Sequence, residues 1–184
     1  MKVIAYLAAS LDGYIADSSG GVDWLNSLPN PDQSDYGFSE FFDSIDAMLM
    51  GANTFRTVQS FGDWPYTKPV FVLSRSIKQM PEGFEGKIEI VEGDVIRVLK
   101  NLESRGYKNI YVDGGTVVQS CLAQNLLDDL IVTHVPLSLG DGIPLFPKSE
   151  HSIRYEHQGT EVLGVGLVKS HYRVQKNTDT QKRP

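Results

Sequence analysis

The sequence has almost no cysteine, since Cys121 is the only one among 184 residues. A single thiol excludes a disulfide within the chain and a metal centre built from several cysteines, and it indicates a reducing compartment. Cys121 is surrounded along the chain by Val117, Val118 and Leu122. This apolar neighbourhood predicts a small buried core residue and not a reactive thiol.

An excess of basic residues and a long hydrophobic run are also missing. The chain has 17 Lys and Arg against 23 Asp and Glu, a formal net charge of −6, and a pI near 5.2. This balance argues against a nucleic-acid-binding surface. No apolar run approaches the ~18 residues of a membrane span, and the first apolar segment meets Asp12 too early for a signal peptide. We expect a cytoplasmic protein with neither a nucleic-acid partner nor a membrane partner.

Several catalytic motifs are absent as well. The four histidines are His134, His151, His157 and His171, and they show no HExxH or similar ligand spacing. No GxSxG elbow surrounds a serine, and no GxxxxGK[ST] loop occurs. The sequence therefore predicts no metal site and lacks the defining parts of a serine hydrolase or a P-loop enzyme.

The segments that are present alternate between strand and helix patterns. Short apolar runs predict strands at residues 2–11, 47–50, 70–73, 88–91 and 110–112, and helical spacing separates several of them. This alternation predicts an α/β fold with three αβα layers and a mixed, mostly parallel central sheet. Residues 130–139, 152–159 and 162–174 read as strands without intervening helices, so the C-terminal strands should be antiparallel.

The length and the pattern also predict the domain organisation. With 41% hydrophobic residues, the chain is long enough for one domain with a substantial core. We predict a single domain over residues 1–175 and a flexible polar tail over 176–184. Gly164 and Gly166 fall inside a strand pattern and predict a bulge.

Three predicted strands end in residues suited to a phosphate. They end at Gly51, at Ser74-Arg75 and at Gly114-Gly115. Glycine allows a sharp turn and a close approach of the backbone to a ligand, and Thr116 stands where a helix cap is expected. The free N–H groups of the following helix favour an anion. Because such strand ends share one edge of an open α/β sheet, we expect a nucleotide site there.

A site of this kind, without a strong nucleophile or a metal, suits hydride transfer. In that chemistry the cofactor carries the reactive group and the protein orients it. Arg75 and Ser74 could offer a cation and a hydroxyl to an adenosine phosphate, although a solvated Arg75 is an equal alternative.

Four segments together resemble the dihydrofolate reductase superfamily. The closest resemblance is to stand-alone relatives of the C-terminal reductase domain of the bacterial bifunctional riboflavin-biosynthesis deaminase-reductase. The matching segments are SLDGYIA at 10–16, MGANTF at 50–55, VLSR at 72–75, and DGGT at 113–116 with residues 130–146. They span nearly the whole predicted domain in the family's order.

The resemblance implies NADPH as the cofactor and assigns residues to it. The nicotinamide would lie against Ala8, Ala9 and Ile15. The pyrophosphate and the adenosine 2′-phosphate would be held by Gly51, Asn53, Thr54, Ser74, Arg75, Gly114, Gly115, Thr116 and Val117. Folate reductases often have an arginine after the glycine of the second motif, where this chain has Ala52, so the 2′-phosphate would depend more on Arg75. The resemblance also implies a cis peptide between Gly114 and Gly115.

The resemblance also suggests residues for substrate binding and catalysis, and several of them have a structural alternative. Asp35 and Glu40 both lie in the region where folate reductases place an acidic residue, and Thr133 aligns with a threonine near their substrate. We take Asp35 and Thr133 as the catalytic candidates. Trp24 and Phe38 could stack on a flat ring or simply pack in the core. Asp12 could face substrate, but an Asp before Gly more often bonds its own turn.

The implied activity is hydride transfer from NADPH to a small heterocycle of the pyrimidine or pterin kind. It would be similar to that of 5-amino-6-(5-phosphoribosylamino)uracil reductase. Two other classes stay open at this stage: a non-catalytic nucleotide-binding or sensing protein, and a structural module that keeps only the fold. Relatives are often homodimers, so we expect a homodimer with a small-molecule substrate.

Overall fold

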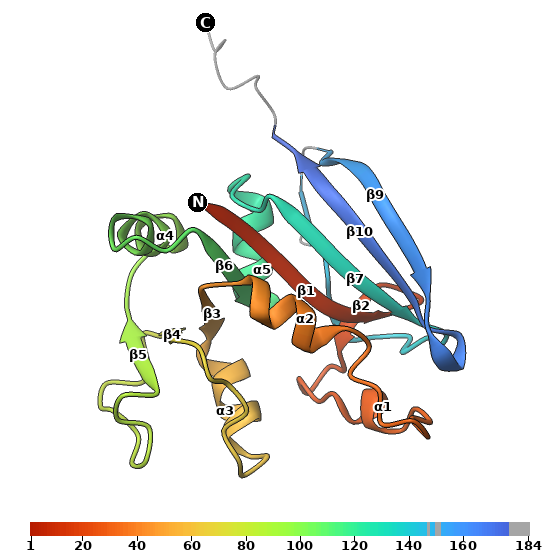
Figure 1. Ribbon diagram of the computed structural model, residues 1–184, viewed down its shortest axis with the longest axis horizontal. Coiled ribbons are helices and arrows are strands. Elements are labelled where there is room, and N and C mark those ends of the chain that lie inside the picture. Colours follow the sequence, from red (N-terminus) through yellow and green to blue (C-terminus); the bar gives the residue numbers. More distant parts are fainter. Residues whose placement is uncertain (147, 150–151, 177–184) are drawn as a thin grey trace, which may run out of the picture.

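A computed structural model of the protein describes residues 1–146, 148–149 and 152–176. Its centre is an eight-stranded sheet in the order β5-β4-β3-β6-β1-β7-β10-β9 (Figure 1). The strands of this sheet are β1 Lys2–Ser10, β3 Ala47–Gly51, β4 Val70–Leu73, β5 Ile88–Val91, β6 Asn109–Asp113, β7 Asp129–Val135, β9 Arg154–Val162 and β10 Val168–Gln175. The helices are α1 Asp23–Asn26, α2 Phe38–Ser44, α3 Ala52–Gln59, α4 Val95–Ser104 and α5 Gly115–Ala123.

The pairing of the strands confirms the predicted mixed, mostly parallel sheet. The strands from β5 to β7 pair in parallel, and β10 and β9 continue the sheet in antiparallel pairs. A two-stranded sheet joins β2 Tyr14–Ala16 to β8 Ile143–Pro144. Parallel strands bring their carboxyl ends to one edge, so the ends of β3, β4 and β6 are neighbours there.

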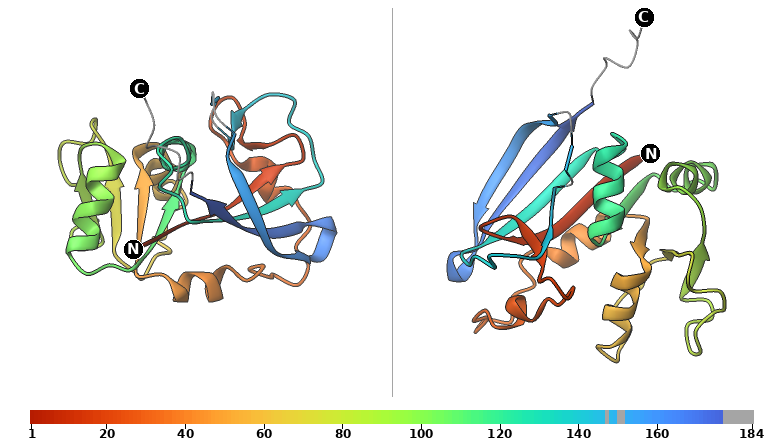
Figure 2. Two further views of the ribbon diagram at one scale, coloured as in Figure 1. Left: turned by 90° about the horizontal axis from the view of Figure 1, so that it is seen from above. Right: turned by 180° about the vertical axis from the view of Figure 1, so that it is seen from behind.

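Helices cover both faces of the sheet, as Figure 2 shows from two sides. One core contains the buried sides of α4 and α5, including Leu99, Leu102 and Val118. The other contains α2 and α3, where Phe41, Phe42 and Phe55 are buried against the opposite face. Cys121 is fully buried in the first core, as its apolar neighbours predicted, and burial raises the pKa of its thiol to about 12.

Several predicted boundaries are corrected. β7 ends at Val135, four residues earlier than expected, and β9 covers residues 154–162. Gly164 and Gly166 do not form a bulge inside a strand: they belong to the short 3₁₀ turn Gly164–Gly166 that connects β9 to β10. Gly166 takes φ +81°, a left-handed conformation that glycine adopts without strain, so the chain reverses direction there.

The division into a domain and a tail stays a prediction. Apart from Lys176, the predicted tail lies outside the described residues. Among the helices within the described ranges, none is both long and apolar enough to cross a bilayer.

Candidate functional site

The three predicted strand ends converge on one cleft of about 1420 Å³ at the carboxyl edge of the sheet. This volume exceeds the range of roughly 300–1,000 Å³ that is typical of small-molecule pockets, so the cleft is large enough for an extended ligand such as a dinucleotide. Its lining includes Gly51 at the end of β3, Ser74 and Arg75 after β4, and Gly114 and Gly115 after β6. In Figure 1 the helices α3 and α5 start from the ends of β3 and β6.

The turn after β6 depends on glycine. Gly114 takes φ +86°, and a Cβ atom there would overlap Oγ1 of Thr54. A Cβ on Gly115 would lie 3.0 Å from side-chain carbons of Ile15 and Ile143. A larger side chain at either position would fill the cleft or distort its wall.

Two details of this turn correct the sequence-based expectations. The peptide between Gly114 and Gly115 is trans, and the turn is made with a positive φ at Gly114. Thr116 is not the cap of α5 either: the helix begins at Gly115, with Gly114 in the cap position. Thr116 lies within the first turn, and it still lines the cleft.

Two helices open into the cleft without a side-chain cap. No side chain at the cap position accepts a hydrogen bond from the first N–H groups of α3 or of α5. In α4, by contrast, the Asp94 carboxylate accepts the amide N–H of Ile96. The uncapped N–H groups of α3 and α5, together with the positive ends of both helix dipoles, suit the phosphate groups of a ligand.

The cations of the cleft lie near the end of β4. Arg56 extends from α3 and donates hydrogen bonds to Asn53 Oδ1 (3.0 Å) and Ser76 Oγ (3.0 Å). Arg75 is exposed beside it and also lines the cleft. Ser74 is buried, and its hydroxyl oxygen accepts the amides of Ser76 (3.1 Å) and Ile77 (2.9 Å). Ser74 therefore shapes the turn after β4. The exposed polar groups on this side of the cleft come from Arg56, Arg75 and Ser76.

Sequence reasoning missed Arg56. It lies four residues after Ala52 and therefore on the same face of α3, so helical spacing from the Gly51 motif was the signal that could have identified it.

With one exception, the residues assigned to the cofactor line this cleft. The exception is Ala9, which is fully buried in the core shared with α5. Side chains alternate between the two faces along a strand, so Ala8 and Ala9 cannot both face the same cavity. Ala8 is the one that lines the cleft.

A second, smaller cavity of about 330 Å³ adjoins the cleft. The two share five lining residues, namely Tyr6, Leu7, Ala8, Leu25 and Tyr111. The smaller cavity is also lined by Leu28, Asn30, Asp35, Tyr36, Phe38, Thr133, Val135 and Leu167. The shared wall makes one continuous site with a large compartment and a small one.

Three of the five residues predicted for substrate and catalysis line the small cavity: Asp35, Phe38 and Thr133. The Asp35 carboxylate accepts the amides of Gly37 and Ser39, each at 2.9 Å. Hydrogen bonds from Ser39 and then Gly37 lower the pKa of Asp35 to about 2, so this group is ionised near neutral pH. Thr133 lies on β7 and is largely buried.

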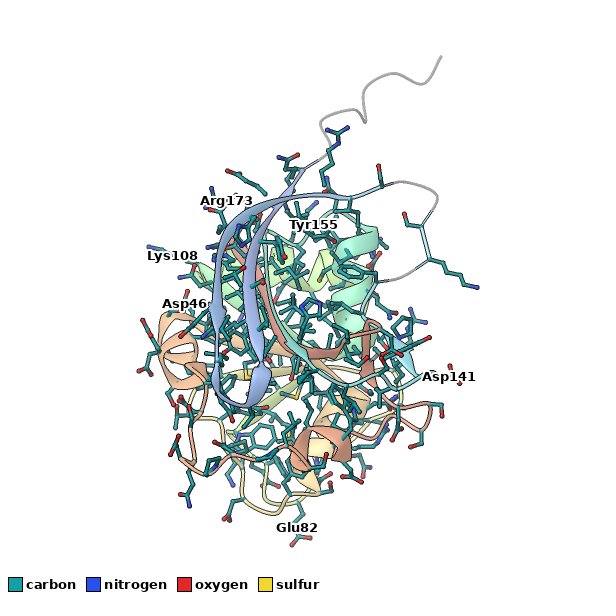
Figure 3. All side chains as sticks on the ribbon, turned by 90° about the vertical axis from the view of Figure 1, so that its right-hand side faces the viewer. Asp46, Glu82, Lys108, Asp141, Tyr155 and Arg173 are labelled. Atoms are coloured by element: carbon teal, nitrogen blue, oxygen red, sulfur yellow. The ribbon has the colours of Figure 1, made fainter. Side chains whose placement is uncertain are left out.

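The other two, Asp12 and Trp24, line neither cavity. Asp12 accepts hydrogen bonds from Ser10 Oγ (2.6 Å) and from the amides of Leu139 (3.1 Å) and Gly140 (2.8 Å). It therefore ties its own turn to the loop that contains Asp141, which lies at the outer edge of the molecule (Figure 3). Trp24 lies in α1, and its buried Nε1 has no hydrogen-bond partner among the described residues.

A carboxyl group that sequence reasoning did not single out lies at the end of β6. Asp113 lines the large cleft next to the glycine turn, and its Oδ1 accepts the Gly114 amide at 2.8 Å. Burial raises the pKa of Asp113 to about 6, although the hydrogen bond from the Gly114 amide opposes the shift. Its neighbour Tyr111 donates its hydroxyl to the Tyr6 carbonyl at 2.9 Å and lines both compartments.

Within the described ranges, no three His, Cys, Asp or Glu residues gather as metal ligands.

The architecture is that of the dihydrofolate reductase-like α/β proteins. Dihydrofolate reductase from Enterococcus faecalis, in a structure complexed with NADP(H) and RAB-propyl, has a TM-score of 0.66 at 16% identity. The alignment covers 95% of this chain and 96% of that one. Within this class the chain belongs to the RibD C-terminal domain family, whose model matches residues 1–169.

Two other solved structures are similar. A protein from Shewanella sp. PV-4, named for riboflavin biosynthesis, is 40% identical with a TM-score of 0.90, over 95% of this chain and 99% of that one. The diaminohydroxyphosphoribosylaminopyrimidine deaminase/5-amino-6-(5-phosphoribosylamino)uracil reductase of Thermotoga maritima is 16% identical with a TM-score of 0.73. That alignment covers 95% of this chain but only 56% of the longer bifunctional protein.

Proposed function

We propose that the protein is an NADPH-dependent reductase that transfers a hydride to a small heterocyclic substrate of the pyrimidine or pterin kind. The observation that carries the proposal is the two-compartment site. A cleft of dinucleotide size receives two uncapped helix N-termini, and it shares one wall with a smaller aromatic cavity. A reductase of this kind needs a nicotinamide and a substrate ring in contact, and the shared wall is where the two compartments meet.

The residues of the large cleft fit NADPH. The N–H groups at the start of α3 and α5 would bind the pyrophosphate, and the bare Cα atoms of Gly114 and Gly115 leave room for it. Ile15 and Ala8 would border the nicotinamide. The NADP(H) bound in the Enterococcus faecalis structure, which shares the fold, supports the same choice of cofactor.

The adenosine end favours NADPH over NADH. Arg56 and Arg75 lie on the same side of the cleft as Ser76, so two guanidinium groups and a hydroxyl are available for a 2′-phosphate. Arg56 thus supplies a cation that the sequence, with Ala52 after the glycine, did not predict.

NADPH, when bound, supplies a hydride from the nicotinamide. The chain supplies orientation and a place for a proton. Asp113 is a proton store near the shared wall, since its pKa of about 6 leaves a fraction of the carboxyl protonated near neutral pH. Thr133 lines the small cavity, and its hydroxyl would orient a polar ring atom of the substrate or a water molecule.

Turnover tests the proposal. The purified protein is incubated with NADPH that carries deuterium at C4 of the nicotinamide, together with one candidate substrate at a time. The candidates are pterins, pyrimidines and small carbonyl compounds, and mass spectrometry measures deuterium in the product. Transfer to a member of the panel is the expected result. Saturable NADPH binding without transfer to any of the three classes would contradict the reductase and favour a nucleotide-binding protein without catalysis.

The cellular location and the oligomeric state of the reductase are also proposals. We expect the reductase to be cytoplasmic and homodimeric, with a small molecule as its only substrate partner. Sedimentation equilibrium at micromolar protein concentration measures the second expectation, and a monomer would contradict it.

A further inference from the structure

We infer that the small cavity binds a planar nitrogen heterocycle that carries no phosphate or carboxylate tail. The inference rests on the proposed function, because it takes the small cavity to be the substrate compartment. It differs from what the name of the Thermotoga maritima reductase states, since the substrate in that name is a phosphoribosyl compound.

The walls of the cavity are suited to a flat ring. Tyr6, Tyr36, Phe38 and Tyr111 line it together with leucine and valine side chains. Tyr6 donates its hydroxyl to the Tyr36 carbonyl at 3.2 Å, and Tyr111 donates to the Tyr6 carbonyl at 2.9 Å. The Phe38 ring packs edge-on against Tyr6, with 5.8 Å between the centroids. These contacts fix an aromatic wall before any ligand binds, which favours stacking with a rigid ring.

The cavity offers no cation to an anionic tail. None of the described residues that line it is Lys, Arg or His. Buried phosphate and carboxylate groups need charge-assisted hydrogen bonds, and guanidinium or ammonium groups are their usual donors. A volume of about 330 Å³ also lies at the lower end of the range for small-molecule sites.

A cation beside the cavity wall is already paired. Lys169 on β10 donates to the Tyr36 carbonyl at 3.0 Å and forms an ion pair with Glu161 at 2.9 Å. Its side chain is only 19% exposed. A phosphate would have to compete with a carboxylate that already holds this ammonium group.

The charged side chain among the described residues that line the cavity is negative. It is the ionised Asp35 carboxylate, and Glu161, although paired with Lys169, also acts on the Tyr6 hydroxyl. Burial raises the pKa of Tyr6 first, and the negative charges of Asp35 and Glu161 raise it further. An anionic tail would meet repulsion here, whereas N–H groups on the edge of a ring would find a carboxylate and the Thr133 hydroxyl as acceptors.

Calorimetry with paired ligands tests the inference. The pairs are 5-amino-6-ribitylaminouracil with its 5′-phosphate, and 6-methylpterin with folate, each titrated into the full chain with and without NADP⁺. We expect the member without the anionic group to bind at least about tenfold more tightly in at least one pair, a difference of about 1.4 kcal/mol. Equal or tighter binding of the anionic member in both pairs, or no binding of any of the four compounds, would overturn the inference.

Charge variants locate the discrimination. Asp35→Asn removes the charge and keeps one acceptor oxygen for the two amides that Asp35 binds at the start of α2. This variant should reduce several-fold the preference for the ligand without an anionic tail, and a urea unfolding curve checks that it is folded. Glu40→Gln removes the same charge from the same region at a residue that does not line the cavity. It should leave the affinity ratio between the two members of each ligand pair within about twofold of the wild-type value. Lys169→Met should not weaken the phosphate compound selectively. A selective loss in that variant would show that Lys169 binds the phosphate and would refute the inference.

Different results would refute the reductase function and the ligand selectivity of the small cavity. Absence of NADPH binding with the ligand preference intact would remove the reductase function and leave the cavity's selectivity standing. Deuteride transfer to 5-amino-6-(5-phosphoribosylamino)uracil in preference to its dephosphorylated form would remove the selectivity and leave the reductase function standing.

Discussion

Replacing Asp113 with asparagine should change how the stability of the protein depends on pH. Asp113 has some surface facing the cleft, but protein atoms surround its carboxyl group, and burial raises its pKa from 3.8 to about 6. The folded state therefore binds this proton more tightly than the unfolded state does. Stability from this group is fully present below about pH 4, and it is lost as the pH rises through about 6.

The size of the effect follows from the shift. Raising the pKa of a carboxyl from 3.8 to about 6 corresponds to about 3 kcal/mol, which is an upper value because water in the cleft screens part of it. The free energy of unfolding of the wild-type protein should therefore fall by up to about 3 kcal/mol relative to Asp113→Asn between about pH 4 and pH 7.5. Urea unfolding at several pH values in this range measures the difference.

Asp46→Asn is the matched control. Asp46 lies beside Lys108 (Figure 3), and amide hydrogen bonds from Asn109 and Lys108 lower its pKa. Its contribution to stability is lost only as the pH falls through this lowered pKa, so its difference from wild type should stay constant over the same range. A difference for Asp113→Asn that varies by less than about 0.5 kcal/mol would refute the reasoning about its burial.

Three further predictions concern the proposed cofactor and substrate groups. Arg56→Ala should weaken NADPH binding about tenfold, the loss of one charge-assisted hydrogen bond, and NADH binding much less; equal losses by calorimetry would refute its role. Gly114→Ala should lower the free energy of unfolding by about 1–3 kcal/mol and abolish NADPH binding, whereas Gly106→Ala, with a similar φ of +96° and open space, should lose only stability. Thr133→Val should lower kcat and leave the NADPH Kd within about twofold; an unchanged kcat would refute a role for the Thr133 hydroxyl in the reaction.

The edge of the sheet that lines the large cleft was predictable because short local sequence patterns determine it. Apolar strands that end at Gly51, at Ser74 and at Gly114 place their ends side by side once the sheet is parallel, and the structure confirms this convergence. Fold class followed from the same alternation of strands and helices. The antiparallel C-terminal strands were predictable from the missing helices between them.

Other parts of the site depend on packing, and the local pattern does not contain them. The raised pKa of Asp113 comes from enclosure by groups far away in the sequence, so its residue type alone gave no signal. The burial of Ala9 depends on the face of β1 that meets α5. The conformation of the Gly114 turn was taken from a resemblance, and in this chain a trans peptide with a positive φ makes the turn.

The division of the site into two compartments was equally hidden from the sequence. Tyr6 and Tyr111 come from β1 and β6, which are adjacent only in the folded sheet, and together they line both cavities. No spacing within the sequence joins these two residues to Asp35 and Thr133.

Titration of the protein with NADPH and NADH tests whether the large cleft binds a nicotinamide dinucleotide. Protein fluorescence and energy transfer from the two tryptophans to the reduced nicotinamide report binding of either cofactor. We expect saturable binding of both, with NADPH the tighter by about tenfold, the value of one phosphate contact. No saturable binding of either cofactor would contradict this expectation.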